Sequence, residues 1–241
     1  MVPIDINAVT VCINFSHYLK HTISNKRFFK RWVIVTHQDD KETIKLCKKH
    51  GLEYIFSKRI YERTFFKGAA INEGIEYLGK DQEWYCHIDA DVLLNNNFPS
   101  TFSDNQIHGL LRHTFVERVL THSQYINQLP DALYLYTMGR INLNGDEDLN
   151  KVDFNKVFKM KDKIIQQWLG WGYFQLFNAF ALKEVYDGLH DFYPTMSYNA
   201  GTDDYLFKQL FYQVINLNTH CIHLSPEKVF WNGIESSPEF K

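Results

Sequence analysis

The sequence has few of the residues that would place it in a specialised structural class. Its 241 residues include only four cysteines and six prolines. The cysteines lie far apart, without the paired spacing of a zinc site. A disulfide framework is not expected in a chain long enough to bury a full core, so we interpret the cysteines as reduced core residues. The formal net charge is only −2, which argues against binding a polyanion across the whole surface.

Long hydrophobic runs are also missing. No apolar stretch approaches the roughly twenty residues that cross a bilayer. The opening residues, Met-Val-Pro-Ile-Asp-Ile-Asn, lack the basic start and apolar run of a signal peptide. We therefore expect a cytoplasmic protein without a transmembrane segment.

Apolar and aromatic side chains, by contrast, are abundant. Hydrophobic residues make up 45% of the chain and charged residues 22%, which is typical of a soluble globular enzyme. Aromatic residues reach 16%. Such side chains bury large areas, and they also line sites that stack against flat or sugar-like ligands.

Strand patterns alternate with helical patterns through the first half of the chain. The expected strands are residues 8–14, 33–36, 53–56 and 84–88. The expected helices are residues 16–29, 41–50 and 68–78. Ser16 would cap the first helix, Asp39 or Asp40 would cap the second, which ends at Gly51, and Gly79 would stop the third. This alternation with short connections predicts an α/β fold, a mostly parallel twisted sheet with helices on both faces.

The second half is less regular. The elements expected there are strands at residues 108–112, 174–182 and 221–224 and a helix at about 202–214. Neither an internal repeat nor a linker is visible, so we predict a single domain over residues 1–241.

The most informative short pattern is Asp89-Ala90-Asp91, which directly follows the strand expected to end at Ile88. Strand alternation would point both carboxylates to one side, where two like charges need a cation or hydrogen-bond donors. Mg²⁺ or Mn²⁺ takes carboxylate oxygens and shares substrate phosphate oxygens. Aspartates also serve as turn and capping residues at strand ends, so the triplet alone leaves both interpretations open. Because ligands of parallel sheets bind beyond the carboxyl ends of the strands, we expect Asn14, residues 36–40 and the triplet to share one site.

A longer motif adds to this interpretation. The segment Lys67-Gly68-Ala69-Ala70-Ile71-Asn72-Glu73-Gly74-Ile75, followed by His87-Ile88-Asp89-Ala90-Asp91, resembles the nucleotide-sugar-binding half of GT-A fold glycosyltransferases. It is most similar to the inverting enzymes of family 2 and to relatives with a galactosyltransferase-type second half. The resemblance covers residues 8–94 well and the remainder through scattered landmarks.

The resemblance implies a metal-dependent glycosyltransferase that moves a sugar from a nucleotide-diphosphate sugar, which we expect to be a UDP-sugar, to an acceptor hydroxyl with inversion. It divides the domain into a nucleotide-sugar-binding half (1–94), an acceptor and catalytic half (95–224) and a tail (225–241). The tail contains Trp231, which we expect to fold over the donor as a lid.

Donor-side roles follow from the same motif. The resemblance makes Asp91 the main metal ligand, Asp89 a ligand of the metal or the ribose, and His223 a further metal ligand, with Mn²⁺ or Mg²⁺ as the ion. The remaining donor-site residues that it implies are Asn14 and Phe15 at the nucleobase, Asp39 or Asp40 at the nucleoside, Lys67 at the diphosphate or base, and Asn72. The alternatives are a solvated lysine for Lys67 and helix capping for the two aspartates.

Acceptor-side roles fall on two landmarks. Trp171, Gly172 and Tyr173 resemble the glycine-rich aromatic stretch under the acceptor sugar, although a turn that leads into a core strand fits Trp171 equally well. Asp203 and Asp204 match the acidic pair of the family. Asp204 would then be the general base and Asp203 would orient the acceptor, although the alignment of these two aspartates with the family's pair could be shifted by one residue. The alternative for both is capping of a helix.

Several functional alternatives remain at this point. A retaining mechanism is the nearest. A nucleotidyltransferase of related fold would have a glycine-rich basic loop after the first strand, which the sequence lacks. A non-catalytic binding module would not need the Asp89-Ala90-Asp91 triplet, the acidic pair and His223 together. The acceptor is not determined and could be a saccharide, a protein, a lipid-linked sugar or a hydroxylated base in nucleic acid, the last because of basic stretches such as Lys26 to Arg31.

Overall fold

The computed structural model describes residues 5–62, 65–96, 98, 133–135, 140–142, 148–157, 159, 173–180, 182, 191–195, 203, 204, 206, 207, 210, 214–216 and 221–224. The strand expected at residues 108–112 lies outside this set, as do Trp171, Gly172 and Trp231.

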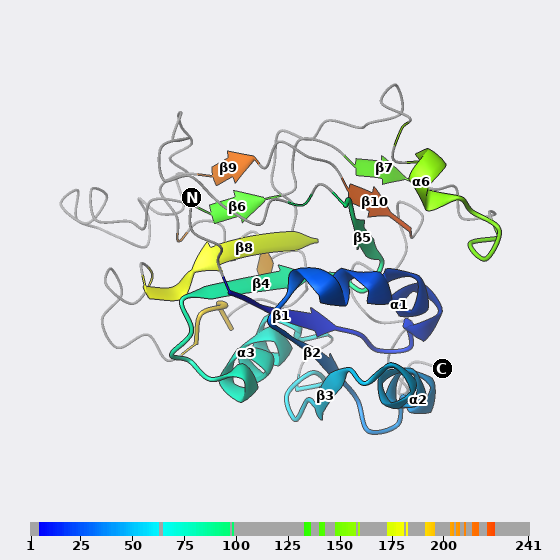
Figure 1. The fold of residues 1–241 in the computed structure, drawn as a ribbon. Coiled ribbons are helices and arrows are strands. Elements are labelled where there is room, and N and C mark those ends of the chain that lie inside the picture. Colours follow the sequence, from blue (N-terminus) through cyan, green and yellow to red (C-terminus); the bar gives the residue numbers. More distant parts are fainter. Residues whose placement is uncertain are drawn as a thin grey trace.

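Strands and helices alternate as far as residue 94 (Figure 1). In chain order they are β1 (Ile6–Val11), α1 (Ser16–Thr22), the 3-10 helix η1 (Ile23–Phe28), β2 (Arg31–Thr36), α2 (Lys41–His50), β3 (Glu53–Phe56), α3 (Lys67–Leu78), β4 (Trp84–Ile88) and β5 (Val92–Leu94). Further along are β6 (Leu133–Leu135), β7 (Arg140–Asn142), α6 (Phe154–Val157), β8 (Phe174–Asn178), β9 (Val214–Asn216) and β10 (Cys221–His223).

The main sheet has the order β3-β2-β1-β4-β8-β6-β9. The first four strands are parallel, β8 runs antiparallel to both β4 and β6, and β9 is parallel to β6. The carboxyl ends of β1, β2 and β4 therefore meet at one edge. A smaller sheet, β5-β10-β7, continues from the end of β4. The predicted α/β class with a mostly parallel sheet is confirmed.

Helices cover both faces of this sheet. On one face, Leu19 of α1 and Cys47 of α2 pack against the side chains of β1 and β2 that point toward them. On the other face, Ile71 and Ile75 of α3 pack with Val9 and neighbouring valines of β2. These β-branched and aliphatic positions alternate along each strand, which is why both faces are buried.

Local signals explain most of the element boundaries. The Asp40 carboxylate accepts a hydrogen bond from the Thr43 amide and caps α2, while Gly51 ends that helix with a left-handed φ of 58°. β3 and β4 have the predicted bounds. The cap expected from Ser16 is wrong, because Ser16 is already helical and Phe15, the residue before it, forms no side-chain cap.

Further boundaries differ from the predictions. The first strand, predicted over residues 8–14, is Ile6–Val11, and the second begins at Arg31 rather than at residue 33. The helix expected over residues 16–29 is a short α-helix that changes to a 3-10 helix at Ile23. The strand predicted to reach residue 182 ends at Asn178, after which residues 179 and 180 are helical. Residues 203, 204, 206 and 207 are helical, but residue 214 already belongs to β9.

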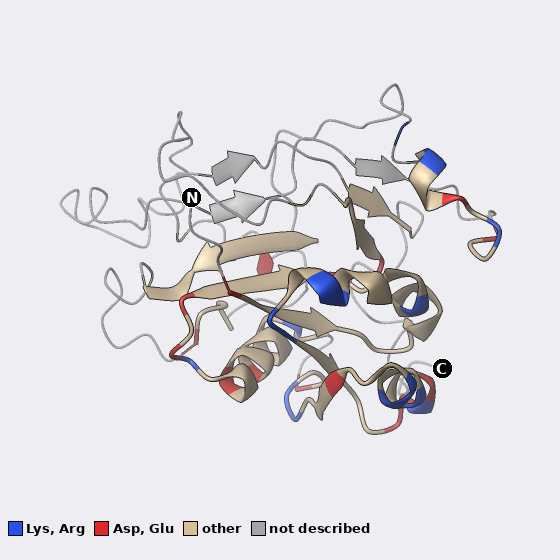
Figure 2. Cartoon of the chain, in the orientation of Figure 1, with Lys and Arg blue, Asp and Glu red and all other residues tan. Residues whose placement is uncertain are grey.

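Basic residues gather on α1, η1 and α2 (Figure 2). Several of them have partners within the protein. Lys26 donates to the carbonyl of Gly51 at 2.8 Å, and Lys30 pairs with Asp5 at 2.7 Å. Arg31 pairs with Glu53 across β2 and β3. These contacts favour a structural role for the stretch from Lys26 to Arg31.

Among the helices of the described ranges, none combines the length and the apolar character needed to cross a bilayer.

Candidate active site

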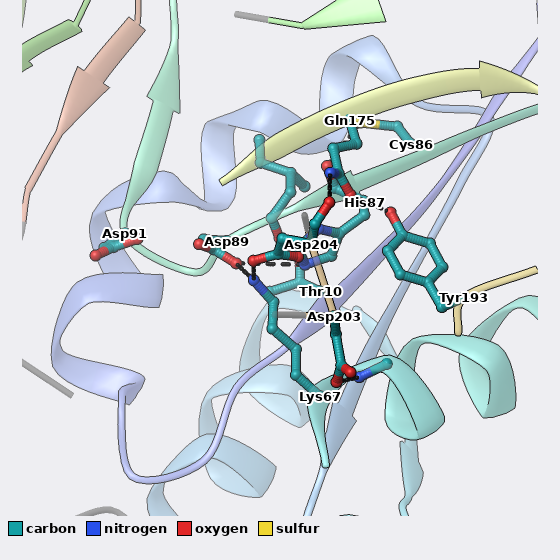
Figure 3. A network of polar contacts seen from close by, with 12 residues as sticks. Thr10, Lys67, Cys86, His87, Asp89, Asp91, Gln175, Tyr193, Asp203 and Asp204 are labelled. Carbon is teal, nitrogen blue, oxygen red and sulfur yellow. Dashed lines mark hydrogen bonds and ion pairs between the residues drawn. The ribbon is translucent and has the colours of Figure 1, made fainter. Parts of the chain in front are cut away.

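The Asp89-Ala90-Asp91 triplet forms the turn between β4 and β5 at the carboxyl edge of the main sheet. The Asp89 amide donates to the carbonyl of Tyr173 at 2.8 Å, and the Leu224 amide donates to the carbonyl of Asp91 at 2.8 Å. Because β4 ends at Ile88, strand alternation does not govern the two carboxylates. In Figure 3 the two side chains lie apart, and Asp89 is joined to Lys67.

Lys67, the first residue of α3, lies between two acidic side chains. Its Nζ is 2.9 Å from Asp89 Oδ1 and 3.0 Å from Asp204 Oδ2 (Figure 3). Burial alone would lower the lysine pKa, but the charges of Asp204 and Asp89 outweigh it and raise that pKa above its usual value. Lys67 is only 6% exposed, so the interpretation as a solvated lysine is wrong.

Asp89 has a second polar neighbour, His87 of β4. The His87 Nε2 lies 3.3 Å from Asp89 Oδ1, and the imidazole is buried. Burial tends to raise the pKa of Asp89, but the Lys67 charge and the His87 contact together hold it well below its usual range. Asp89 is therefore a carboxylate whose Oδ1 is occupied by protein partners.

The surroundings of Asp204 raise its pKa, in contrast to those of Asp89. Asp204 is buried, and within the described part of the chain its Oδ1 has no hydrogen-bond partner. Burial raises the pKa of Asp204 above its usual value, and the neighbouring Asp89 charge adds to this, although Lys67 and His87 act in the other direction. One oxygen is thus fixed by Lys67, while the other is a buried acceptor without a partner among the described residues.

Asp203 is fully buried and points away from its neighbour. Its Oδ2 accepts a hydrogen bond from the Gly68 amide at 2.8 Å. A Cβ on Gly68 would lie 3.0 Å from that oxygen and 2.9 Å from the Pro194 carbonyl, so the close approach needs glycine. The capping interpretation of Asp203 therefore applies to α3, a helix far away in the sequence.

Asp91 and His223 form a separate pair beside β10. The Asp91 Oδ2 lies 3.4 Å from His223 Nε2, and Asp91 is buried. The Tyr173 ring contacts the His223 ring at 6.1 Å between centroids. The structure thus joins residues that the sequence separates by more than half of the chain.

A carboxylate and an imidazole suit Mn²⁺ as ligands. Within the ranges that the structure covers, no group of three or more His, Cys, Asp or Glu side chains is arranged to hold a metal ion. Divalent ions at phosphate sites often use one or two protein ligands and take the rest from phosphate and water. Asp91 and His223 fit that arrangement, whereas the Oδ1 of Asp89 is already held by Lys67.

The turn after β1 is anchored by Asp40. Its Oδ2 accepts the Asn14 amide at 2.6 Å and the Thr36 hydroxyl at 3.3 Å, while its Oδ1 accepts the Thr43 amide. Asn14 has a left-handed φ of 57°, an uncommon conformation that this anchor holds in place. The Asp39 side chain, by contrast, is exposed and lies 3.4 Å from His37.

Phe15 packs in an aromatic group with His17 and Tyr18 at the start of α1. The ring centroids of Phe15 lie 5.6 Å and 5.5 Å from those of His17 and Tyr18. Burial and then the Asp91 charge raise the pKa of Tyr18. Its side chain packs against a cluster that includes Leu93 of β5, the strand that follows the triplet. Sequence reasoning missed His17 and Tyr18, although two neighbouring ring side chains just after Asn14, Phe15 and Ser16 were a usable signal.

Asn72 and three other polar residues complete the buried network. The Asn72 amide group donates to the Tyr193 carbonyl and accepts from the Tyr193 amide, both at 2.8 Å. His87, Gln175 and Tyr193 were not among the predicted site residues. His87 and Gln175 could have been noticed as polar residues within otherwise apolar strands.

Comparisons with known proteins give only distant likenesses. No protein-family model matches the sequence. The phenylalanine–tRNA ligase beta subunit of Bacillus subtilis (strain 168) is 25% identical over 142 residues, which are 58% of this chain but only 17% of that protein. This match is too partial to assign an activity.

The solved structures to which this chain is similar include two sugar phosphoglycerate synthases. Glucosyl-3-phosphoglycerate synthase from Mycobacterium tuberculosis, in complex with phosphoglyceric acid, is similar over 93% of this chain and 73% of that chain, at 11% identity and a TM-score of 0.48. Mannosyl-3-phosphoglycerate synthase from Rubrobacter xylanophilus is similar over 73% of this chain and 53% of that chain, at 15% identity and a TM-score of 0.37. Likenesses at these TM-scores are too weak to carry a functional conclusion.

Proposed function

We propose that this chain is a GT-A type glycosyltransferase that uses a divalent metal ion and transfers a sugar from a UDP-sugar to an acceptor hydroxyl with inversion. The observation that carries the proposal is the environment of Asp204. Its carboxylate is buried, one oxygen is fixed by Lys67 at 3.0 Å, and the other has no partner within the described residues. An inverting transfer requires a carboxylate with these properties to deprotonate the attacking hydroxyl.

The base has a defined task. Asp204 Oδ1 accepts the proton of the acceptor hydroxyl while the hydroxyl oxygen forms a bond to the anomeric carbon. The bond from that carbon to the diphosphate breaks, and its electron pair leaves with the phosphate oxygen. The raised pKa of Asp204 increases its basicity at neutral pH.

The donor side uses residues at the same edge of the sheet. Asp91 and His223, 3.4 Å apart, would hold the ion, and a bound divalent ion stabilises negative charge on a departing diphosphate. The Lys67 ammonium adds positive charge at the same edge and fixes Asp89. The aromatic group Phe15, His17 and Tyr18 is available to contact the nucleoside.

A donor screen tests this proposal. The protein is incubated with Mn²⁺ and UDP, GDP, CMP and dTDP sugars, and thermal stabilisation and donor hydrolysis are measured. We expect stabilisation and slow hydrolysis with a UDP-sugar, and loss of both in Asp91→Asn. Asp81→Asn, an exposed aspartate beyond α3, is the matched control and should behave as wild type.

The outcomes separate the alternatives. Absence of stabilisation by every nucleotide sugar would overturn the proposal. Release of pyrophosphate from a nucleoside triphosphate and a sugar phosphate would identify a nucleotidyltransferase instead. Analysis of the anomeric configuration of the product by NMR distinguishes inversion from retention.

A further inference from the structure

We propose that Tyr193 and Gln175 are positioning residues for Asp204. In this arrangement Tyr193 fixes the orientation of the Gln175 side-chain amide, and Gln175 in turn holds the main chain of Asp204 in place. The inference rests on the proposed function, in which Asp204 is the general base. Neither positioning residue needs to contact the substrate.

The orientation of Gln175 follows from its partners. Its Nε2 donates to the main-chain carbonyl of Asp204 at 3.2 Å, and its Oε1 accepts from the Tyr193 hydroxyl at 2.6 Å (Figure 3). A carbonyl can only accept, so the amide nitrogen must face Asp204. The oxygen must then face Tyr193, and the tyrosine hydroxyl is the donor.

Tyr193 is itself held on several sides. The Asn72 side chain pairs with both its amide and its carbonyl, and its ring stacks on Phe207 at 3.9 Å with an interplanar angle of 5°. Phe207 lies three residues after Asp204, and both residues are helical. Burial raises the pKa of Tyr193 well above its usual value, so the hydroxyl remains protonated and able to donate.

This chain of contacts gives Asn72 a different role from the donor-binding role predicted for it. Asn72 and Lys67 both belong to α3. Lys67 contacts the Asp204 carboxylate directly, whereas Asn72 acts on the Asp204 main chain through Tyr193 and Gln175. One helix therefore determines both the position and the charge environment of the base.

Accurate placement of the base matters for the rate. A displacement of about 1 Å of a reacting group can lower the rate roughly a hundredfold. If the Tyr193 hydroxyl is lost, Gln175 Oε1 is left without its donor in a buried site, and the amide is no longer fixed from that side. Gln175 then holds the Asp204 carbonyl less firmly, which allows the main chain of Asp204 to shift.

The test compares Tyr193→Phe with a matched control, Tyr85→Phe. Tyr85 belongs to the same buried cluster, but its hydroxyl donates to the Gly79 carbonyl, at the opposite end of β4 from the site. Steady-state hydrolysis of the donor found in the screen is measured for both variants. For Tyr193→Phe we expect kcat to fall roughly ten- to a hundredfold with the donor KM unchanged, and for Tyr85→Phe we expect no change in kcat.

A double variant tests the coupling between the two residues. Gln175→Leu should lower kcat, and adding Tyr193→Phe to it should cause little further loss, because residues that act through one contact are not additive. Independent, additive losses would contradict the inference. Equal effects of Tyr193→Phe on kcat and on the donor KM would also contradict it.

Failure of the inference can be told apart from failure of the proposed function. If Asp204→Asn abolishes turnover while Tyr193→Phe retains the wild-type kcat, the positioning role is wrong and the base assignment stands. If Asp204→Asn retains turnover, the base assignment is wrong and the positioning role falls with it.

Discussion

At the scale of single residues, Lys67 is the centre of the site. It is buried between the carboxylates of Asp89 and Asp204, and its positive charge stabilises both of them. Removing one partner of a buried ion pair leaves an uncompensated charge and typically costs about 3–5 kcal/mol.

We therefore expect Lys67→Met to lower the free energy of unfolding by about 3 kcal/mol. Urea denaturation at pH 7 measures this change. Lys45→Met, on the exposed face of α2, is the control and should lie within about 0.5 kcal/mol of wild type. A loss below about 1 kcal/mol in Lys67→Met would mean that the three charges are not coupled as the distances indicate.

Asp89 gives a pH-dependent contribution of defined sign. Its pKa in the folded protein lies below the ordinary value, so its stabilising effect is present above the unfolded pKa and is lost as the pH falls through the folded pKa. Asp89→Asn should lower the free energy of unfolding by roughly 1–3 kcal/mol at pH 7. The difference from wild type should shrink steadily below about pH 4, as measured by urea denaturation across pH. A difference independent of pH would contradict the ion pair.

The pKa of Asp204 shifts in the opposite direction to that of Asp89, so its effect on stability has the opposite dependence on pH. Its raised pKa means that the folded protein retains a proton that the unfolded chain has released, so ionisation of Asp204 costs stability as the pH rises through this interval. The same ionisation creates the base. We expect kcat to rise with pH along an acid limb whose midpoint lies above the ordinary aspartate pKa of about 3.9, in a pH–rate profile of donor hydrolysis. A rate that is flat from pH 4 to 8 would argue against Asp204 as the base.

At the scale of elements, α3 connects the core to the site, and Gly74 sets how closely it packs on the sheet. A Cβ at Gly74 would lie 2.5 Å from Val9 Cγ1 and 2.9 Å from Val35 Cγ2. Gly74→Ala should destabilise the protein by about 1–3 kcal/mol through overpacking, despite a gain in helix propensity of about 1 kcal/mol. The double variant Gly74→Ala with Val9→Ala should recover part of this loss in thermal denaturation. No recovery would show that the strain arises elsewhere.

The elements also show which features could be predicted. β3, β4 and the ends of α2 follow from local signals, namely apolar alternation, the Asp40 cap and the Gly51 terminus, and these predictions were confirmed. The contacts of Lys67, Gly68 and Asn72 with the second half join residues 121 to 137 positions apart. No local pattern encodes such contacts, which is why Lys67 was open to interpretation as solvated and why Tyr193 was not considered.

At the scale of the whole molecule, the site draws on both halves of the chain. The first half contributes α3 and the turn after β4, and the second half contributes Asp203, Asp204 and His223. The Asp91–His223 pair that was expected from the motif is present at 3.4 Å, and its role as a metal site remains a prediction.

We expect His223→Gln to raise the Mn²⁺ concentration needed for stabilisation by the UDP-sugar by at least roughly tenfold. The readout is a thermal shift series with increasing Mn²⁺. His50→Gln, an exposed histidine at the end of α2, is the matched control. An unchanged Mn²⁺ requirement in His223→Gln would remove His223 from the ligand set.

The hydrogen bond from Gly68 to Asp203 has a consequence for experiments on the intact protein. The amide hydrogen of Gly68 is held by a carboxylate adjacent in sequence to Asp204, so it exchanges with solvent only when that segment leaves α3. Hydrogen–deuterium exchange at this single amide therefore reports how often the segment with Asp203 and Asp204 detaches from α3. It does so without substrate, and without knowledge of the acceptor.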